Sequence, residues 1–243
     1  MKTWRTARGT EIARLLAGRS NVFLVSREGR HVLVDTSPAY RWPRLKRRLR
    51  RLGIAALDAL VLTHAHFDHA GSAARLQKEF AAPVIVQRAE AEALASGESV
   101  LPEGTNRFTR FLVARLRRLA AGRARCAPCR ADVLAGERLD LREYGIGACV
   151  LHTPGHTPGS QSLIVDDEFA LVGDAMFGVF PGSAFPPFAC DAEQLVASWG
   201  RLLGTGCRVF LPSHGAANSR RLLERDHKKR TSGNEDRRKH AGP

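Results

Sequence analysis

A group of imidazoles and a carboxylate placed directly after an apolar run constrains this chain more than any other feature. Residues 59–63 (ALVLT) form a short apolar run, typical of a strand that is buried on both faces, and they lead into residues 64–69 (HAHFDH). Such polar side chains are costly to bury without partners, whereas a loop at a strand end can turn several of them toward one cation. Imidazole nitrogens and carboxylate oxygens suit zinc, iron or manganese, and the absence of thiolates disfavours a purely structural zinc. The motif therefore predicts a metal site.

Three further residues of the ligand type follow predicted strands. His156 lies between two apolar runs in the segment 153–160 (TPGHTPGS), Asp174 follows residues 170–173, and His214 follows residues 209–211. One such residue alone would more often be structural. Ligand-type residues at four separate strand ends indicate a common site.

The apolar patterns alternate between strand and helix along the chain. Runs at 21–26 and 30–35, separated by Glu28-Gly29, predict a hairpin, and helical spacing over 42–52 predicts an amphipathic helix that ends at Gly53. A helix at 72–80 and a buried strand at 83–87 follow, then a basic helical region at 88–125 with apolar residues on one face. Further strands are predicted at 138–141, 148–152, 161–166, 168–173 and 208–211, with a helix at 195–203. This alternation predicts an α/β layered domain.

Composition and charge bound the remaining possibilities. The chain has 243 residues, of which 44% are hydrophobic, and these suffice for one large core. No apolar stretch is long enough for a membrane span and no signal-peptide core follows the N-terminus, so we expect a soluble, cytoplasmic protein. The formal charge of +14 is concentrated at 41–51 and after residue 220; it favours a solvated helix face and a tail over a nucleic-acid surface. We predict one domain over 1–218 and a basic, disordered tail over 219–243; the sequence indicates no oligomeric state.

The five cysteines do not predict a disulfide framework, because their number is odd and no secretion signal is visible. Cys126 and Cys129 have the spacing of a redox pair or of half a zinc site. A single pair of this kind is a weak signal, since a structural zinc normally needs four ligands. An ordinary surface loop is the favoured interpretation.

Together, the motifs at 64–69 (HAHFDH), 153–160 (TPGHTPGS), 173–174 (GD) and 213–215 (SHG) resemble those of the metallo-β-lactamase-fold hydrolase superfamily. The order of the motifs agrees over roughly residues 20 to 215. The resemblance implies a four-layer αβ/βα sandwich with its metals at one edge. It also implies a supporting structural role for Asp35, whereas His152 does not match a ligand position and is predicted to be structural.

The resemblance further implies a binuclear site with two divalent ions. Zinc is the favoured metal, and iron and manganese are the alternatives. One ion would be held by His64, His66 and His156, the other by Asp68, His69 and His214, with Asp174 bridging both. Two metals can lower the pKa of a shared water to about 7, so that the resulting hydroxide attacks an electrophilic carbonyl or phosphorus. Asp68 is the predicted catalytic residue, steering the hydroxide and passing a proton to the leaving group.

The substrate is less well indicated. A bridging Asp174 turns the resemblance away from true β-lactamases and toward glyoxalase II and acyl-homoserine lactonases, although Phe177 stands where the lactonases carry a tyrosine. We therefore expect a small-molecule thioester, lactone or other ester. The alternatives are a nucleic-acid phosphodiesterase and a mononuclear-iron enzyme such as a persulfide dioxygenase. A non-enzymatic metal-binding or interaction protein is the least favoured alternative. In the aromatic segment 176–188, Phe177, Phe180 and Phe185 are the predicted substrate contacts, and the helical insert at 105–120 is predicted to cover the other side of the pocket.

Overall fold

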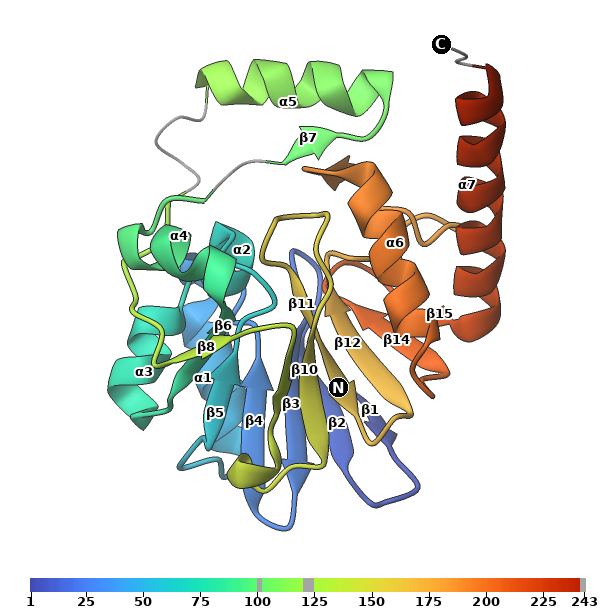
Figure 1. The fold of residues 1–243 in the computed structure, drawn as a ribbon. Coiled ribbons are helices and arrows are strands. Elements are labelled where there is room, and N and C mark those ends of the chain that lie inside the picture. The colour runs from blue at the N-terminus through green and yellow to red at the C-terminus, as the bar shows by residue number, and fades with distance from the viewer. Residues whose placement is uncertain (100–101, 120–124, 241–243) are drawn as a thin grey trace.

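Two β-sheets face each other in the computed structural model of the protein, and helices cover the outer face of each (Figure 1). The structure describes residues 1–99, 102–119 and 125–240, and the side chains of 112, 116–119 and 233–240 lie outside this description. One sheet has seven strands in the order β1 (Lys2–Arg5), β2 (Glu11–Leu16), β3 (Val22–Arg27), β4 (Arg30–Val34), β5 (Ala59–Val61), β6 (Val84–Gln87) and β8 (Val133–Ala135).

The second sheet has six strands and packs against the first. Its order is β15 (Asn218–Ser219), β14 (Val209–Pro212), β12 (Phe169–Gly173), β11 (Gln161–Val165), β10 (Ala148–His152) and β9 (Arg138–Asp140). A small separate sheet pairs β7 (Glu103–Gly104) with β13 (Phe188–Ala189). The helices are α1 (Trp42–Arg51), α2 (Phe67–Ala70), α3 (Ala73–Phe80), α4 (Ala91–Ser96), α5 (Arg107–Leu119), α6 (Ala192–Leu203) and α7 (Arg220–His240), with 3-10 turns η1 (Ala39–Arg41), η2 (Arg88–Glu90) and η3 (Arg142–Tyr144).

The four layers follow from the two-residue period of the strands. In β3, Leu24 belongs to the core shared with α1, α3 and α4, whereas its neighbours Phe23 and Val25 belong to the core between the sheets. Residues of β10, β11, β12 and β14 divide in the same way between that inner core and a third core under α6 and α7. Both sheets are thus buried on two faces, and the predicted four-layer αβ/βα sandwich is confirmed.

Most of the predicted strands and helices are present. The hairpin turns at Glu28 and Gly29, both with positive φ, and α1 ends at Arg51 with Leu52 as its C-cap. The region 88–125 is not one continuous helix, because η2, α4 and β7 precede α5. The apolar face predicted for α5 is also wrong in part, because Phe108 and Phe111 are exposed. Leu112, Leu116 and Leu119, which the prediction places on the same face, lie outside the described side chains, and among those that are described Thr109 and Val113 are buried.

The segment after residue 219 differs most from its prediction. The sequence predicts a disordered tail, but Arg220 onward forms α7, which packs against α6. Leu223 is fully buried in the third core, and the Asp226 carboxylate accepts a hydrogen bond of 2.9 Å from the backbone N–H of Ala184. A few tertiary contacts at its start therefore order a helix whose composition is mostly charged. No helix of the described residues has the length and apolarity that crossing a membrane requires.

Candidate metal centre

All seven predicted ligand residues meet at one edge of the sandwich, where strands from both sheets end. The loop after β5 carries His64 and His66, and α2 follows with Asp68 and His69. The second sheet supplies the residues that follow β10, β12 and β14, namely His156, Asp174 and His214. Neighbouring strands β4, β5 and β6 run parallel, as do β12 and β14, so their carboxyl ends lie side by side. The fold thereby gathers residues separated by up to 150 positions (from 64 to 214).

Three imidazoles form the first group. The Nε2 atom of His64 lies 2.9 Å from Nδ1 of His66, and Nε2 of His156 lies 3.2 Å from the same Nδ1 atom. One ligand atom from each of the three residues lies within 4.8 Å of the others. Three nitrogen atoms that face one another at this spacing form a donor set suited to one cation.

Asp68, His69 and His214 form the second group. The Nε2 atom of His69 lies 3.8 Å from the Asp68 carboxylate, and Nε2 of His214 lies 3.6 Å from it. Their ligand atoms also lie within 4.8 Å of one another. Nitrogen and oxygen atoms are mixed here, as is common where a metal position remains open to water or substrate.

The Asp174 carboxylate lies between the two groups. Its oxygens lie 3.5 Å from Nε2 of His69 and 3.4 Å from Nε2 of both His156 and His214. Asp174 and His69 are buried, and Oδ1 of the one and Nε2 of the other have no hydrogen-bond partner in the part of the chain that the structure describes. Buried polar atoms are normally paired. Two buried atoms that lie 3.5 Å apart and lack hydrogen-bond partners are the observation that fits this site to a metal.

The protonation states agree with that fit. Burial, with repulsion from neighbouring imidazoles, keeps the pKa of His64 well below its usual value; burial likewise lowers the pKa of His156 to about 4 despite Asp174. Both are therefore neutral at pH 7, which is the form that binds metals. Burial also disfavours charge on His69, but the carboxylates of Asp174, Asp35 and Asp68 outweigh it and raise its pKa to about 10. His69 is therefore protonated at pH 7, and the negative potential that holds this proton would equally favour a metal cation in its place.

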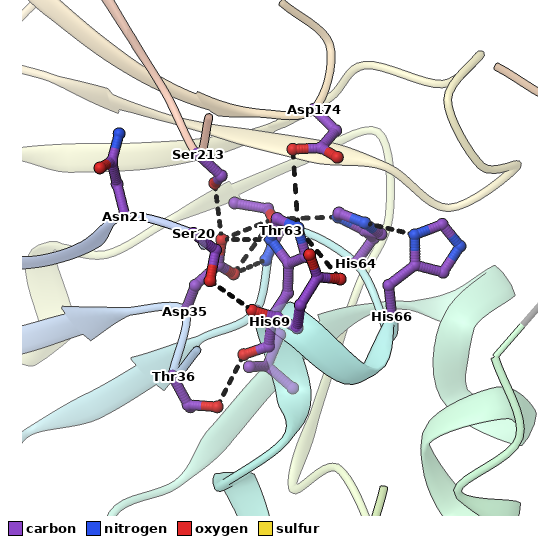
Figure 2. A network of polar contacts seen from close by, with 12 residues as sticks. Ser20, Asn21, Asp35, Thr36, Thr63, His64, His66, His69, Asp174 and Ser213 are labelled. Carbon is purple, nitrogen blue, oxygen red and sulfur yellow. Dashed lines mark hydrogen bonds and ion pairs between the residues drawn. The ribbon is translucent and has the colours of Figure 1, made fainter. Parts of the chain in front are cut away.

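Asp35 holds the His69 side of the centre in place (Figure 2). Its buried carboxylate accepts a hydrogen bond from the Nδ1 atom of His69 at 2.8 Å, from the backbone N–H of Thr63 at 2.8 Å and from the hydroxyl of Ser213 at 2.9 Å. A proton on Nδ1 leaves Nε2 of His69 free to bind a metal. Asp35 itself has a φ of 59°, a strained backbone conformation that asparagine and aspartate tolerate better than most residues. The supporting role predicted for this residue thus has a specific geometry.

A cavity of about 470 Å³ opens onto the two groups of ligands. The residues that line it come from the ligand loops, the β2–β3 loop, α5 with the segment before it, and the aromatic segment 176–188: Gly18, Arg19, His66, Phe67, Asp68, Pro102, Val113, His156, Asp174, Phe177, Phe188 and His214. The helical insert does border the pocket, through Val113. Arg19 is a lining residue that no sequence motif singles out. Phe67 lies within the motif at 64–69 and Phe188 ends the aromatic segment 176–188, but neither is among the three predicted substrate contacts.

Only one of the three predicted substrate contacts is a lining residue. Phe177 borders the cavity, and its ring stacks on His214 with 4.7 Å between ring centroids. Phe180 is half exposed and is absent from the lining. Phe185 packs edge-on against Trp199 and lies under the guanidinium of Arg230, so its ring is already covered. The geometry therefore does not support Phe180 or Phe185 as substrate contacts.

Two other sequence features lie apart from the ligand groups. His152, at the end of β10, bonds through its ring nitrogens to Glu137 at 2.9 Å and to the carbonyl of Pro158 at 2.9 Å, in keeping with a structural role. Cys129 is buried and donates to the side-chain oxygen of Gln77, so the prediction of an ordinary surface loop is wrong for this residue. Cys126 is partly buried and packs on the same core.

Comparison with known proteins agrees with this geometry. The family model described as the metallo-beta-lactamase superfamily matches residues 15–214. An N-acyl homoserine lactonase of a Bacillus species is 33% identical over 161 residues, 63% of this chain; the match spans only 54% of the lactonase. Hydroxyacylglutathione hydrolase GloC of Haemophilus influenzae is 30% identical over 190 residues, 77% of this chain and 81% of its own length. A metallo-beta-lactamase of Cronobacter sakazakii has a similar fold, with a TM-score of 0.66 at 20% identity over 98% of this chain and 94% of its own.

Proposed function

Because the chain belongs to the metallo-beta-lactamase superfamily, we propose that it is a hydrolase that cleaves a small-molecule thioester, lactone or other ester. The proposed enzyme holds two divalent ions, and zinc is the favoured metal. The observation that carries this proposal is a pair of buried atoms, Nε2 of His69 and Oδ1 of Asp174, that lie 3.5 Å apart between two groups of ligand-type residues. Neither atom has a hydrogen-bond partner in the described part of the chain. His64, His66 and His156 would hold one ion. Asp68, His69 and His214 would hold the other, and Asp174 would be shared.

When bound, divalent ions would supply Lewis acidity and a water of lowered pKa at neutral pH. The chain's own contribution begins with Asp68, whose side chain is 16% exposed and lines the cavity. It is more accessible to water than Asp174, so it can accept a proton from the attacking water and pass it to the leaving group. The more deeply buried Asp174 is a poorer candidate for this transfer, because the imidazoles around it hold its pKa far below the usual range despite its burial.

The walls of the cavity support an acyl substrate. Phe177 and Phe188 come from the aromatic segment, and Val113 of α5 lies among the same lining residues. Apolar side chains of this kind favour a hydrocarbon portion in the substrate, while a few polar groups orient its reactive end. Two of the relatives described above bear names that agree with such a substrate, an N-acyl homoserine lactonase and a hydroxyacylglutathione hydrolase.

A test combines metal analysis with a substrate screen. We expect two zinc-like ions per chain and hydrolysis of a thioester or lactone that stops on chelation and returns with added zinc. His66→Ala and Asp174→Ala should each remove metal-dependent turnover while the far-ultraviolet circular dichroism of the protein stays unchanged. Full activity in either variant would refute the ligand assignment.

The same experiment separates the two alternatives. One iron per chain without hydrolysis would favour the mononuclear-iron enzyme. Cleavage of phosphodiesters together with salt-sensitive binding of RNA or DNA would favour the nuclease. The formal charge of +14 is the reason to test this alternative.

A further inference from the structure

Glu90 is a buried carboxylate close to the ligand loops, and none of the roles described above uses it. It ends η2, directly after β6, and is only 5% exposed. In the described part of the chain its side chain has no ion-pair partner, and its hydrogen bonds are two, both from backbone N–H groups. A carboxylate in such surroundings is costly unless strong donors face both oxygens.

The two donors come from the two loops that carry the first group of imidazoles. Oε2 accepts from the backbone N–H of Ala65 at 2.9 Å, and Ala65 is the residue between His64 and His66. Oε1 accepts from the backbone N–H of Gly159 at 3.1 Å, three residues after His156. One side chain thus holds the peptide at the centre of one ligand loop and a peptide of the other.

The contact at Gly159 is too close for any other residue. A Cβ atom at this position would lie 2.5 Å from Cγ of Glu90 and 3.0 Å from its backbone nitrogen. Ala65 is held at its next peptide group as well, since its carbonyl accepts from the hydroxyl of Ser99 at 3.0 Å. Both loops therefore pack closely against this side chain.

Glu90 also joins the two sheets. Ala65 follows β5 of the seven-stranded sheet, and Gly159 lies between β10 and β11 of the six-stranded sheet. We propose that Glu90 is a positioning residue that sets the distance between the His64–His66 loop and His156, and so sets the metal affinity of this group alone. The inference rests on the proposed function, because it assumes that these imidazoles bind a metal.

The chemistry requires a carboxylate rather than an isosteric amide. Both donors are backbone N–H groups, which cannot rotate away or act as acceptors. In a Glu90→Gln variant one N–H would face the amide oxygen and the other would face the amide nitrogen, donor against donor. The volume stays the same, and only the connection between the two loops is lost.

The test is a titration of metal-free protein with Zn²⁺ against a chromophoric chelator. We expect the wild type to bind two ions and Glu90→Gln to bind one of them about 10- to 100-fold more weakly, the range seen when a supporting contact of a ligand is removed. Affinity for the other ion should stay within about twofold. Glu92→Gln, the same substitution on the exposed side of α4, should change neither.

A second control separates positioning from stability. Asp166 is a buried carboxylate beyond the far end of β11 that accepts the hydroxyl of Thr6 at 2.7 Å. Asp166→Asn should lower the unfolding temperature without weakening the binding of either ion. The inference would be overturned if Glu90→Gln bound both Zn²⁺ ions with wild-type affinity. It would also be overturned if Asp166→Asn lost as much Zn²⁺ affinity as Glu90→Gln. If Glu90→Gln does not fold, Glu90→Asp, which is too short to reach both donors, must weaken the binding of the same single ion. Failure of the wild type to bind Zn²⁺ would refute the proposed function instead.

Discussion

Replacing Asp35 by asparagine should change the tautomer of His69. The Oδ1 atom of Asp35 accepts a hydrogen bond from the backbone N–H of Thr63. Because this N–H group is fixed in the backbone and can only donate, the amide oxygen of the asparagine must take the place of Oδ1. The amide nitrogen then faces Nδ1 of His69, where Oδ2 accepted a hydrogen bond of 2.8 Å. To avoid two facing donors, the neutral form of His69, which is the form that binds a metal, must carry its single proton on Nε2, the atom that lies 3.5 Å from Asp174. The proposed ligand atom is thereby blocked.

The size of the effect follows from the contacts that are lost. A hydrogen bond to a charged group contributes about 1.5–3 kcal/mol to stability, and the side chain of Asp35 is 1% exposed, so solvent cannot replace it. Loss of an orienting carboxylate typically weakens a metal site about 10- to 100-fold, or about 1.4–2.7 kcal/mol. We expect a weaker second ion, held by Asp68, His69 and His214, and an unchanged first ion.

Zinc competition titration would measure the affinities, and nitrogen NMR of the metal-free variant above pH 10, where His69 is neutral, would identify the protonated ring nitrogen. Asp166→Asn, a substitution of a buried carboxylate remote from the site, is the control for general destabilisation. Wild-type affinity for both ions, or a proton that remains on Nδ1, would show that Asp35 does not select the tautomer.

Three further predictions test the cavity, the C-terminal helix and the thiols. Phe177→Ala should raise KM several-fold with an apolar acyl substrate and change kcat less, since it removes a wall of the cavity; an equal KM would exclude the contact. Leu223→Ala should lower the free energy of unfolding by about 2–5 kcal/mol in chemical denaturation, because this side chain is fully buried, whereas a disordered tail would give no change. Burial raises the pKa of Cys129 and Cys207 to about 11, so about one thiol in a thousand is ionised at pH 8. Alkylation of Cys129 and Cys207, followed by mass spectrometry, should accelerate with rising pH and be slower than alkylation of the exposed Cys190. Modification of either buried thiol as fast as that of Cys190 at pH 8 would contradict their burial.

Local sequence signals are sufficient for much of the fold. The β3–β4 hairpin and β5 are short apolar runs with clear turns, and α1 has an apolar stripe against a basic face. By contrast, β1 (KTWR) and β2 (EIARLL) show no regular alternation of polar and apolar residues. Their strand conformation depends on pairing, of β2 with β3 and of β1 with β2. For α7, the few residues that contact the core decide its order, and they are a minority in a charged segment.

The site likewise contains residues that local sequence signals identify and residues that only tertiary contacts reveal. The proposed ligands lie in dense local motifs, so their residue types and spacing are enough to single them out from the sequence. Glu90 carries no such signal, because its two partners belong to loops that meet only in the folded protein. Phe185 shows the opposite error: an aromatic segment marks it as a substrate contact, but Trp199 and Arg230 already cover its ring.

The division of the centre between two sheets has a consequence for how the protein matures. During synthesis, residues 64–69 leave the ribosome well before His214 is made, and until then the early imidazoles lack their partners from the second sheet. A nascent chain can therefore hold an ion only loosely at this motif. Under the proposed ligand assignment, tight loading must wait until the later strands have docked, so the metal content of the protein would report on the completed sandwich, and a chain misfolded in either half would lack metal.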